Sequence, residues 1–175
     1  MTDMQAPTTD RQIVGDPAVD ARPASVAAQF RQHVAASGAK EAFRWPEGDT
    51  WRSATWRQTG ETVDELAAGL VALGVEPQQT VGIIAGTRYE WITADLAIMC
   101  AGAATTTVYP STIAEDVKLR ERRAELPAIQ QVILIDGEGD GDWVLPLAEV
   151  TERGRALLAD QPQVVEERSA VFVKF

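Results

Sequence analysis

The feature that most constrains the fold is an amphipathic helix pattern between Thr55 and Gly74 that has both a start and a stop signal. Thr55 and Gln58 have the Thr-x-x-Gln spacing of a capping box, in which the two side chains satisfy free amide donors of the first turn. Apolar residues then recur on one face, at Val63, Leu66, Ala67, Leu70 and Leu73. Such a stripe has to face a core, so the pattern predicts a packed domain.

Short apolar segments alternate with further helix patterns along the rest of the chain. Three segments have the composition of buried strands: Thr80–Ala85, Ala104–Tyr109 and Gln131–Ile135. Helices are expected at Thr87–Ala101, Thr112–Leu126 and Leu147–Ala159, the first two opened by capping boxes (Thr87 with Glu90, Thr112 with Glu115). The apolar residues of Thr87–Ala101 lie nearly all round the helix, which predicts deep packing. Strands that alternate with helices predict an α/β fold with a mostly parallel sheet and helical crossovers.

The two ends of the chain are expected to differ in order. Residues 1–24 are rich in Thr, Asp, Ala and Pro without periodicity, which predicts a flexible tail before an ordered domain over 25–175. A first helix is expected from the N-cap Ser25 to Gly38, which would close it at the C′ position. Three more strands are expected: Glu41–Trp45 and Trp51–Thr55 as a hairpin, and Gln163–Phe175 at the end.

Charge and composition exclude several classes of partner. The net charge of −10 argues against nucleic acids and anionic membrane surfaces, because both require basic residues. The single cysteine, Cys100, cannot form an internal disulfide, which suits a reducing compartment. No apolar run reaches the roughly 18 residues of a membrane span, and the N-terminus lacks the apolar core of a signal peptide. These observations predict a cytoplasmic protein without a membrane span.

A search for catalytic motifs finds none that is complete. The phosphate loop Gly-x-x-x-x-Gly-Lys-Ser/Thr, the dinucleotide fingerprint and the Gly-x-Ser-x-Gly elbow do not occur in the sequence. His33 has polar neighbours and is interpreted as a surface residue. Cys100 lies in an apolar helix pattern and is interpreted as inert packing. No catalytic, cofactor-binding or metal-ligating residue is therefore assigned.

An acidic turn near residue 138 has two interpretations. Asp136, Glu138 and Asp140, followed by Gly141, match the first positions of a calcium loop. The twelfth position, however, is Leu147, where such a loop requires a glutamate, and a strand instead of a helix precedes it. A surface turn is therefore favoured over a calcium site.

The basic run and the tryptophans also have a structural and a functional interpretation. Lys118, Arg120, Arg122 and Arg123 lie among acids at three- and four-residue spacing, which is typical of a solvated helix face more than of a phosphate site. The tryptophans 45, 51, 56 and 91 lie at element junctions or in a helix. Core packing is favoured for them over the wall of an acyl channel.

Short sequence words in the middle of the chain resemble a known family. Trp51–Trp56, Leu66–Leu70, Leu73–Val75 and Thr80–Ile83 look like the opening of an AMP-forming acyl-CoA synthetase. Thr87–Trp91, Asp95–Ile98, Ala101–Ala103, Val108–Pro110 and Leu134–Gly137 resemble its long-chain fatty acyl-CoA ligase branch. The resemblance extends over roughly residues 25–168, and it is specific as an ordered series of words.

The resemblance implies an N-terminal AMP-binding-type ligase domain that is truncated. The complete enzymes of the family use ATP and Mg²⁺ to form an acyl-adenylate, from which CoA displaces AMP. Their phosphate loop ending in Pro-Lys-Gly, their Tyr-Gly-x-Thr-Glu motif, their ribose-binding aspartate and their C-terminal lysine have no counterpart in this sequence. No residue can therefore be assigned to ATP, Mg²⁺ or CoA, and the implied function is a fragment of a long-chain fatty acid–CoA ligase that is inactive alone.

The resemblance also implies an internal gap. After Val117 the family usually continues through another helix–strand unit, whereas this chain passes directly to Lys118. A missing strand would leave an incomplete sheet edge, which promotes association with a full-length ligase or with a second copy. Two alternatives to an inactive fragment therefore stay open: a non-catalytic binding or regulatory module that associates with a full-length ligase, and a remnant that folds poorly.

Overall fold

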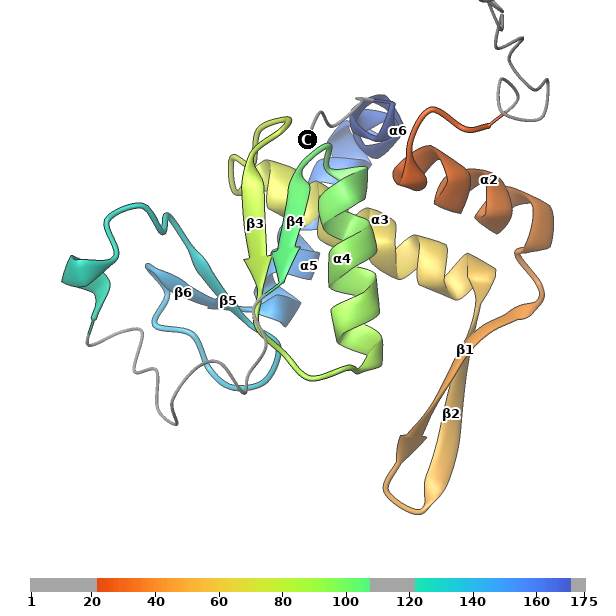
Figure 1. The fold of residues 1–175 in the computed structure, drawn as a ribbon, viewed down its shortest axis with the longest axis horizontal. Coiled ribbons are helices and arrows are strands. Elements are labelled where there is room, and N and C mark those ends of the chain that lie inside the picture. The colour runs from red at the N-terminus through yellow and green to blue at the C-terminus, as the bar shows by residue number, and fades with distance from the viewer. Residues whose placement is uncertain (1–21, 108–121, 171–175) are drawn as a thin grey trace, which may run out of the picture.

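Helices and strands alternate in the computed structural model, which describes residues 22–107 and 122–170 (Figure 1). The helices are α2 (Val26–Ser37), α3 (Trp56–Ala72), α4 (Tyr89–Cys100), α5 (Leu147–Asp160) and α6 (Val164–Ser169), with a short 3₁₀ helix η2 (Arg123–Glu125). The strands are β1 (Glu41–Glu47), β2 (Thr50–Thr55), β3 (Thr80–Ile83), β4 (Ala104–Thr107), β5 (Val132–Leu134) and β6 (Val144–Pro146). The predicted α/β class is confirmed.

The described strands form three separate pairs instead of one sheet. β1 and β2 are the predicted antiparallel hairpin, which projects away from the helices in Figure 1. β3 pairs with β4 in parallel, with Thr80 opposite Ala104, and β5 pairs with β6 in parallel, with Val132 opposite Val144. Parallel pairing is therefore confirmed for two of the pairs, while the continuous sheet is interrupted between them.

Helix α3 lies at the centre of the core and contacts α2, α4, α5 and α6. The predicted capping box is present: the Thr55 amide donates to Gln58 Oε1 at 2.9 Å, and the Gln58 amide donates to Thr55 Oγ1 at 3.3 Å. The predicted stripe is buried except for Leu73, which is half-buried. Gly74 follows with a φ of +89°, a left-handed conformation that glycine adopts readily, so the predicted end of the helix is confirmed.

Two glycines let α3 and α5 approach each other closely. A Cβ built on Gly154 of α5 would lie 1.7 Å from the backbone oxygen of Glu65 in α3. A Cβ on Gly69 of α3 would lie 2.1 Å from the backbone oxygen of Val150 in α5. No side chain fits in either place, so the two helices pack backbone to backbone at this crossing.

Two predicted helix ends are wrong in detail. The N-cap of α4 is Arg88, with no side-chain capping bond, so the predicted capping box at Thr87 does not form. Because α4 begins one residue later than expected, Thr87 lies outside the helix. Gly38 has a φ of −49°, so it does not adopt the left-handed conformation predicted for it. A Cβ on Gly38 would lie 3.1 Å from the Val34 oxygen, and its own carbonyl accepts from the Arg57 amide, so close packing explains this glycine instead.

Helix α4 is less deeply packed than its composition predicts. Thr93, Ala97, Ile98 and Cys100 are buried, but the apolar side chains on the rest of the helix are half-buried. The described neighbours of α4 cover one face and leave the other in partial contact with solvent. The helix ends at Cys100, close to the predicted end at Ala101, and Gly102 follows with a φ of +79°.

The predicted last strand is wrong, because residues 164–169 form helix α6. Val164 and Val165 are buried on the side of α6 that packs against α3 and α4. Ser169 Oγ completes this contact: its one proton can be donated to the Val165 oxygen at 2.6 Å, and the Cys100 oxygen lies within hydrogen-bond distance at 3.3 Å. Packing against two helices therefore overrides the strand preference of the paired valines. The strand β6 was not expected, since three residues are too few for a clear alternation.

Several predictions fall outside the described ranges. Residues 1–21 contain most of the expected tail, 108–121 contain most of the expected helix Thr112–Leu126 and its capping box, and 171–175 contain the end of the expected last strand. These stay predictions, apart from η2, which occupies part of the expected helix. Among the described helices, none is both long enough and apolar enough to cross a membrane.

Candidate functional site

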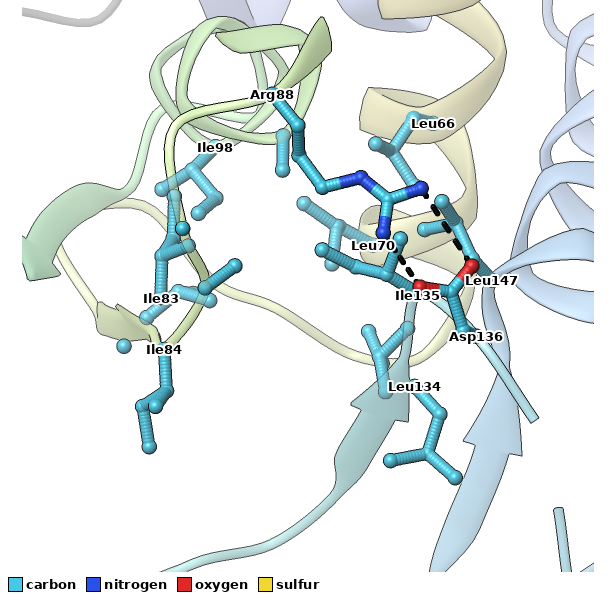
Figure 2. A pocket seen from close by; sticks show the side chains of 16 residues that line it. Leu66, Leu70, Ile83, Ile84, Arg88, Ile98, Leu134, Ile135, Asp136 and Leu147 are labelled. Carbon is cyan, nitrogen blue, oxygen red and sulfur yellow. Dashed lines mark hydrogen bonds and ion pairs between the residues drawn. The ribbon is translucent and has the colours of Figure 1, made fainter. Parts of the chain in front are cut away.

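An apolar groove of about 400 Å³ lies between β3 and β5 and forms the candidate site (Figure 2). α3 contributes Leu66 and Leu70 to its lining. One wall consists of β3 and the residues after it, up to Gly86, and the opposite wall is the segment Ile133–Asp136. Ile84 is 50% exposed although it is a large apolar side chain, so part of this wall faces solvent. The groove is a hydrophobic surface that the described residues leave uncovered.

A cluster of one cation and two carboxylates lies at one end of the groove. Arg88 Nε donates to Glu90 Oε2 at 2.6 Å, and both Nη atoms of Arg88 donate to Asp136, as Figure 2 shows. The bonds from Glu90 and then from Asp136 raise the pKa of Arg88, and the bond from Arg88 lowers the pKa of Glu90. The Asp136 side chain is 76% exposed, so this pair adds little stability. The cluster of Arg88, Glu90 and Asp136 matters for its charge, because its formal charge is −1.

These residues do not fit ATP or Mg²⁺. The cation beside the groove is already paired with two carboxylates, so a phosphate would have to displace them against like charge. Within residues 22–107 and 122–170, no group of three or more His, Cys, Asp or Glu side chains could hold a metal ion. The described lining therefore suits an apolar occupant better than a phosphate group or a metal ion.

His33 and Cys100, the residues considered as a base and a nucleophile, lie in different surroundings and outside the groove. His33 is exposed, as predicted, and its ring contacts the edge of Trp56 with the centroids 4.3 Å apart. Cys100 is fully buried in the core, also as predicted. Neither side chain lines the groove, and neither has the neighbours that would activate it.

Cys100 is expected to be unreactive in the folded chain. Desolvation is the main cause that raises the pKa of its thiol from 9.0 to about 11. At pH 8 this shift lowers the thiolate fraction by roughly 100-fold, and burial slows access further. A thiol-specific disulfide reagent should therefore label the native chain at least ~100-fold more slowly than the chain in guanidinium chloride. Equal labelling rates would contradict a buried, neutral thiol.

The same shift predicts how stability depends on pH. Because the folded-state pKa is raised, the unfolded state binds fewer protons than the folded state between about pH 9 and 11. The Cys100 contribution is therefore constant below pH 9 and should lower the free energy of unfolding as the pH rises through this window. Urea unfolding at pH 8 and pH 10, compared with a Cys100→Ala variant, measures this slope, which the variant should lack.

The acidic turn has structural partners. Asp140 Oδ1 accepts the backbone amides of Asp142 at 3.0 Å and Val144 at 2.8 Å, and so holds the chain where β6 begins. Asp136 bonds Arg88 at the groove, and Gly141 has a φ of +77°. These contacts explain the acidic residues and the glycine as a turn, in agreement with the favoured interpretation.

The tryptophans and the basic run follow the structural interpretation only in part. Trp45 stacks on Tyr89 with the centroids 4.2 Å apart, and Trp56 packs near Phe30 at 6.3 Å, whereas Trp51 is 68% exposed. Packing at element junctions is therefore confirmed for the first two and wrong for Trp51. In the described part of the basic run, Arg122 pairs with Glu125 as expected, but Arg123 pairs with the distant Asp142.

The pairing of Arg88 with Asp136 was not predicted from the sequence. The two residues are 48 positions apart. Arg88 lies in the family-like segment Thr87–Trp91 and Asp136 in Leu134–Gly137, but neither segment indicates that the two side chains meet. A signal was nevertheless present, because Arg88 and Asp136 each follow shortly after a predicted apolar strand. The carboxyl ends of parallel strands meet at one edge of a sheet, so polar residues at these ends are expected to lie near each other.

Comparison with known proteins identifies the family. The model of the AMP-binding enzyme family matches residues 30–169. Long-chain-fatty-acid–CoA ligase FadD15 of Mycobacterium bovis is 30% identical over 142 residues, which covers 64% of this chain and 24% of that protein. The uncharacterized protein Rv1549 of Mycobacterium tuberculosis is 30% identical over 96 residues, covering 55% of this chain and 54% of that protein.

A solved structure shows the same fold. The fatty acyl-adenylate ligase from L. pneumophila, in complex with acyl adenylate and pyrophosphate, superposes with a TM-score of 0.58 at 17% identity, over 76% of this chain and 25% of that one. This chain therefore spans about a quarter of the length of the ligases that it matches. In the alignment with FadD15, 64% of the chain is about 112 residues, so roughly 30 of the 142 aligned positions have no counterpart here. The family match extends over more than half of the sequence, and the chain belongs to the AMP-binding enzyme family.

Proposed function

We propose that this chain is the scaffold-forming N-terminal part of a long-chain fatty acid–CoA ligase and that it makes no acyl-CoA by itself. The family match over residues 30–169 carries the proposal, and the name of the relative FadD15 supports the fatty acid as substrate class. The groove supports the proposal that the chain makes no acyl-CoA by itself, because its walls are apolar and its ion cluster carries a negative formal charge. ATP, Mg²⁺ and CoA would then be bound by parts of a ligase that this chain does not supply.

The test is a direct assay of the complete reaction. Purified chain is incubated with ATP, Mg²⁺, palmitate and CoA, and palmitoyl-CoA and AMP are measured by mass spectrometry. We expect neither product above the level of a sample without protein. A complete long-chain ligase in a parallel reaction is the positive control. Formation of palmitoyl-CoA that scales with the amount of chain would contradict the proposal.

A second candidate function is a non-catalytic module that associates with a full-length ligase. The match to Rv1549 favours it, since 96 aligned residues cover 54% of that protein, which is therefore also a short chain. A tagged chain mixed with a complete ligase should then co-elute with it in gel filtration. A monodisperse monomer that leaves the elution and the turnover of the ligase unchanged would exclude this candidate.

The buried single thiol suits a reducing compartment, and we place either function in the cytoplasm.

A further inference from the structure

We infer that the groove between β3 and β5 is a slot for one β-strand, supplied by a second polypeptide. Among the described strands, β3 pairs only with β4, and β5 pairs only with β6. Residues of β3 and β5 line the groove, and no residue of β4 or β6 does. Within residues 22–107 and 122–170, no strand pairs with the edges of β3 and β5 that border the groove, and such edges can bond to an added strand. This inference concerns a partner and does not depend on whether the chain makes acyl-CoA.

The two edges run in the same direction. Arg88 lies after the carboxyl end of β3, Asp136 lies after the carboxyl end of β5, and the two side chains are hydrogen-bonded to each other. Both strands therefore point toward the same ion cluster, and in Figure 1 they are the inner strands of the two parallel pairs. A strand that enters in parallel can bond to both edges and join the pairs into one sheet.

The lining specifies the side chains of the occupant. Apart from Arg88 and Asp136, the lining consists of Leu, Ile, Val, Ala and Gly residues, and Ile84 remains half-exposed. These walls favour β-branched or aliphatic side chains on the inserted strand. The cluster of Arg88, Glu90 and Asp136 carries a formal charge of −1 at the end where the inserted strand would finish. A basic residue at the carboxyl end of that strand complements this charge. A fatty acid carboxylate placed there meets repulsion instead, which disfavours a free lipid.

The comparison with FadD15 gives an independent reason for an added strand. FadD15 carries about 30 positions within the aligned span that this chain lacks. A segment of this size is large enough to hold a strand together with its connection. The occupant in this inference is an extended apolar segment of another protein that adds one strand at the groove.

The test uses the complete chain and a designed peptide, acetyl-Thr-Val-Thr-Val-Val-Lys-amide. Two control peptides change one property each: proline replaces the central threonine and removes a backbone donor, or glutamate replaces the lysine. Affinity is measured by isothermal titration, and hydrogen exchange locates the binding site. We expect binding of the first peptide, protection of amides in Val81–Ile84 and Ile133–Ile135, and at least ~10-fold weaker binding of both controls.

A pair of matched variants separates the groove from other apolar surfaces. Ile84→Asp places a charge in the groove wall, whereas Ile129→Asp changes the same residue type outside it, where Ile129 is 40% exposed. We expect the first variant to weaken binding of the lysine peptide ~10-fold or more and the second to leave it unchanged. Equal effects of the two variants would overturn the inference. So would strong protection of the groove amides in the chain alone, or tighter binding of palmitate than of the peptide without any new protection.

Discussion

Replacing Gly154 with alanine is expected to lower the free energy of unfolding by about 2–3 kcal/mol. The added Cβ would lie 1.7 Å from the Glu65 oxygen and 2.7 Å from the Gly69 nitrogen. Both are backbone atoms of α3, so no side chain can rotate away, and the helices have to separate. Alanine also gains about 1 kcal/mol of helix propensity over glycine, which offsets only part of this strain.

Urea unfolding followed by far-UV circular dichroism measures the effect. Gly86→Ala is the matched control, because a Cβ on Gly86 has no neighbour within 4 Å and its φ lies outside the left-handed region. The control should change the free energy of unfolding by less than ~0.5 kcal/mol. If Gly154→Ala unfolded at the same urea concentration as the control, the close crossing of α3 and α5 would be wrong. A broad transition of the unchanged chain would instead support the poorly folding remnant.

The elements that the sequence predicts well are those with local signals at both ends. The helix α3 has a capping box at Thr55, an apolar stripe and a left-handed glycine at Gly74, and all three appear in the structure. The sequence-based prediction of a helix or strand fails where a tertiary contact determines the secondary structure. Val164 and Val165 favour a strand by composition, but burial against α3 and α4 holds them in a helix.

The groove illustrates why a site made by packing is harder to predict than a motif. Its lining extends from Leu66 to Leu147, and these residues meet only because α3, β3 and β5, which are far apart in the sequence, border the same space. Hydrophobic composition predicts that each of them is buried, and it does not show which surface remains uncovered. The expected incomplete sheet edge rests on a gap after Val117, which lies outside the described residues, so it stays a prediction.

Replacing Trp143 with alanine is expected to lower the free energy of unfolding by about 3–4 kcal/mol. The Trp143 side chain is 3% exposed, and its Nε1 donates to the Ile129 oxygen at 3.0 Å. The guanidinium of Arg123 lies over the ring, 5.4 Å from its centroid. Removal of the ring leaves a cavity and takes away the donor that bonds the Ile129 carbonyl, so the cost combines lost burial with a lost hydrogen bond.

Two further substitutions separate these causes. Trp143→Phe keeps most of the buried area but removes the indole donor, so it should cost about 1–2 kcal/mol. Trp51→Ala removes a ring that is 68% exposed and should change stability by less than ~0.5 kcal/mol. Circular dichroism is the suitable probe, since both alanine variants alter the tryptophan fluorescence. Equal losses for Trp143→Ala and Trp51→Ala would contradict the burial of Trp143. Because the Trp143 carbonyl also accepts from the Val132 amide, weakening this turn should loosen β5 and, with it, one wall of the groove.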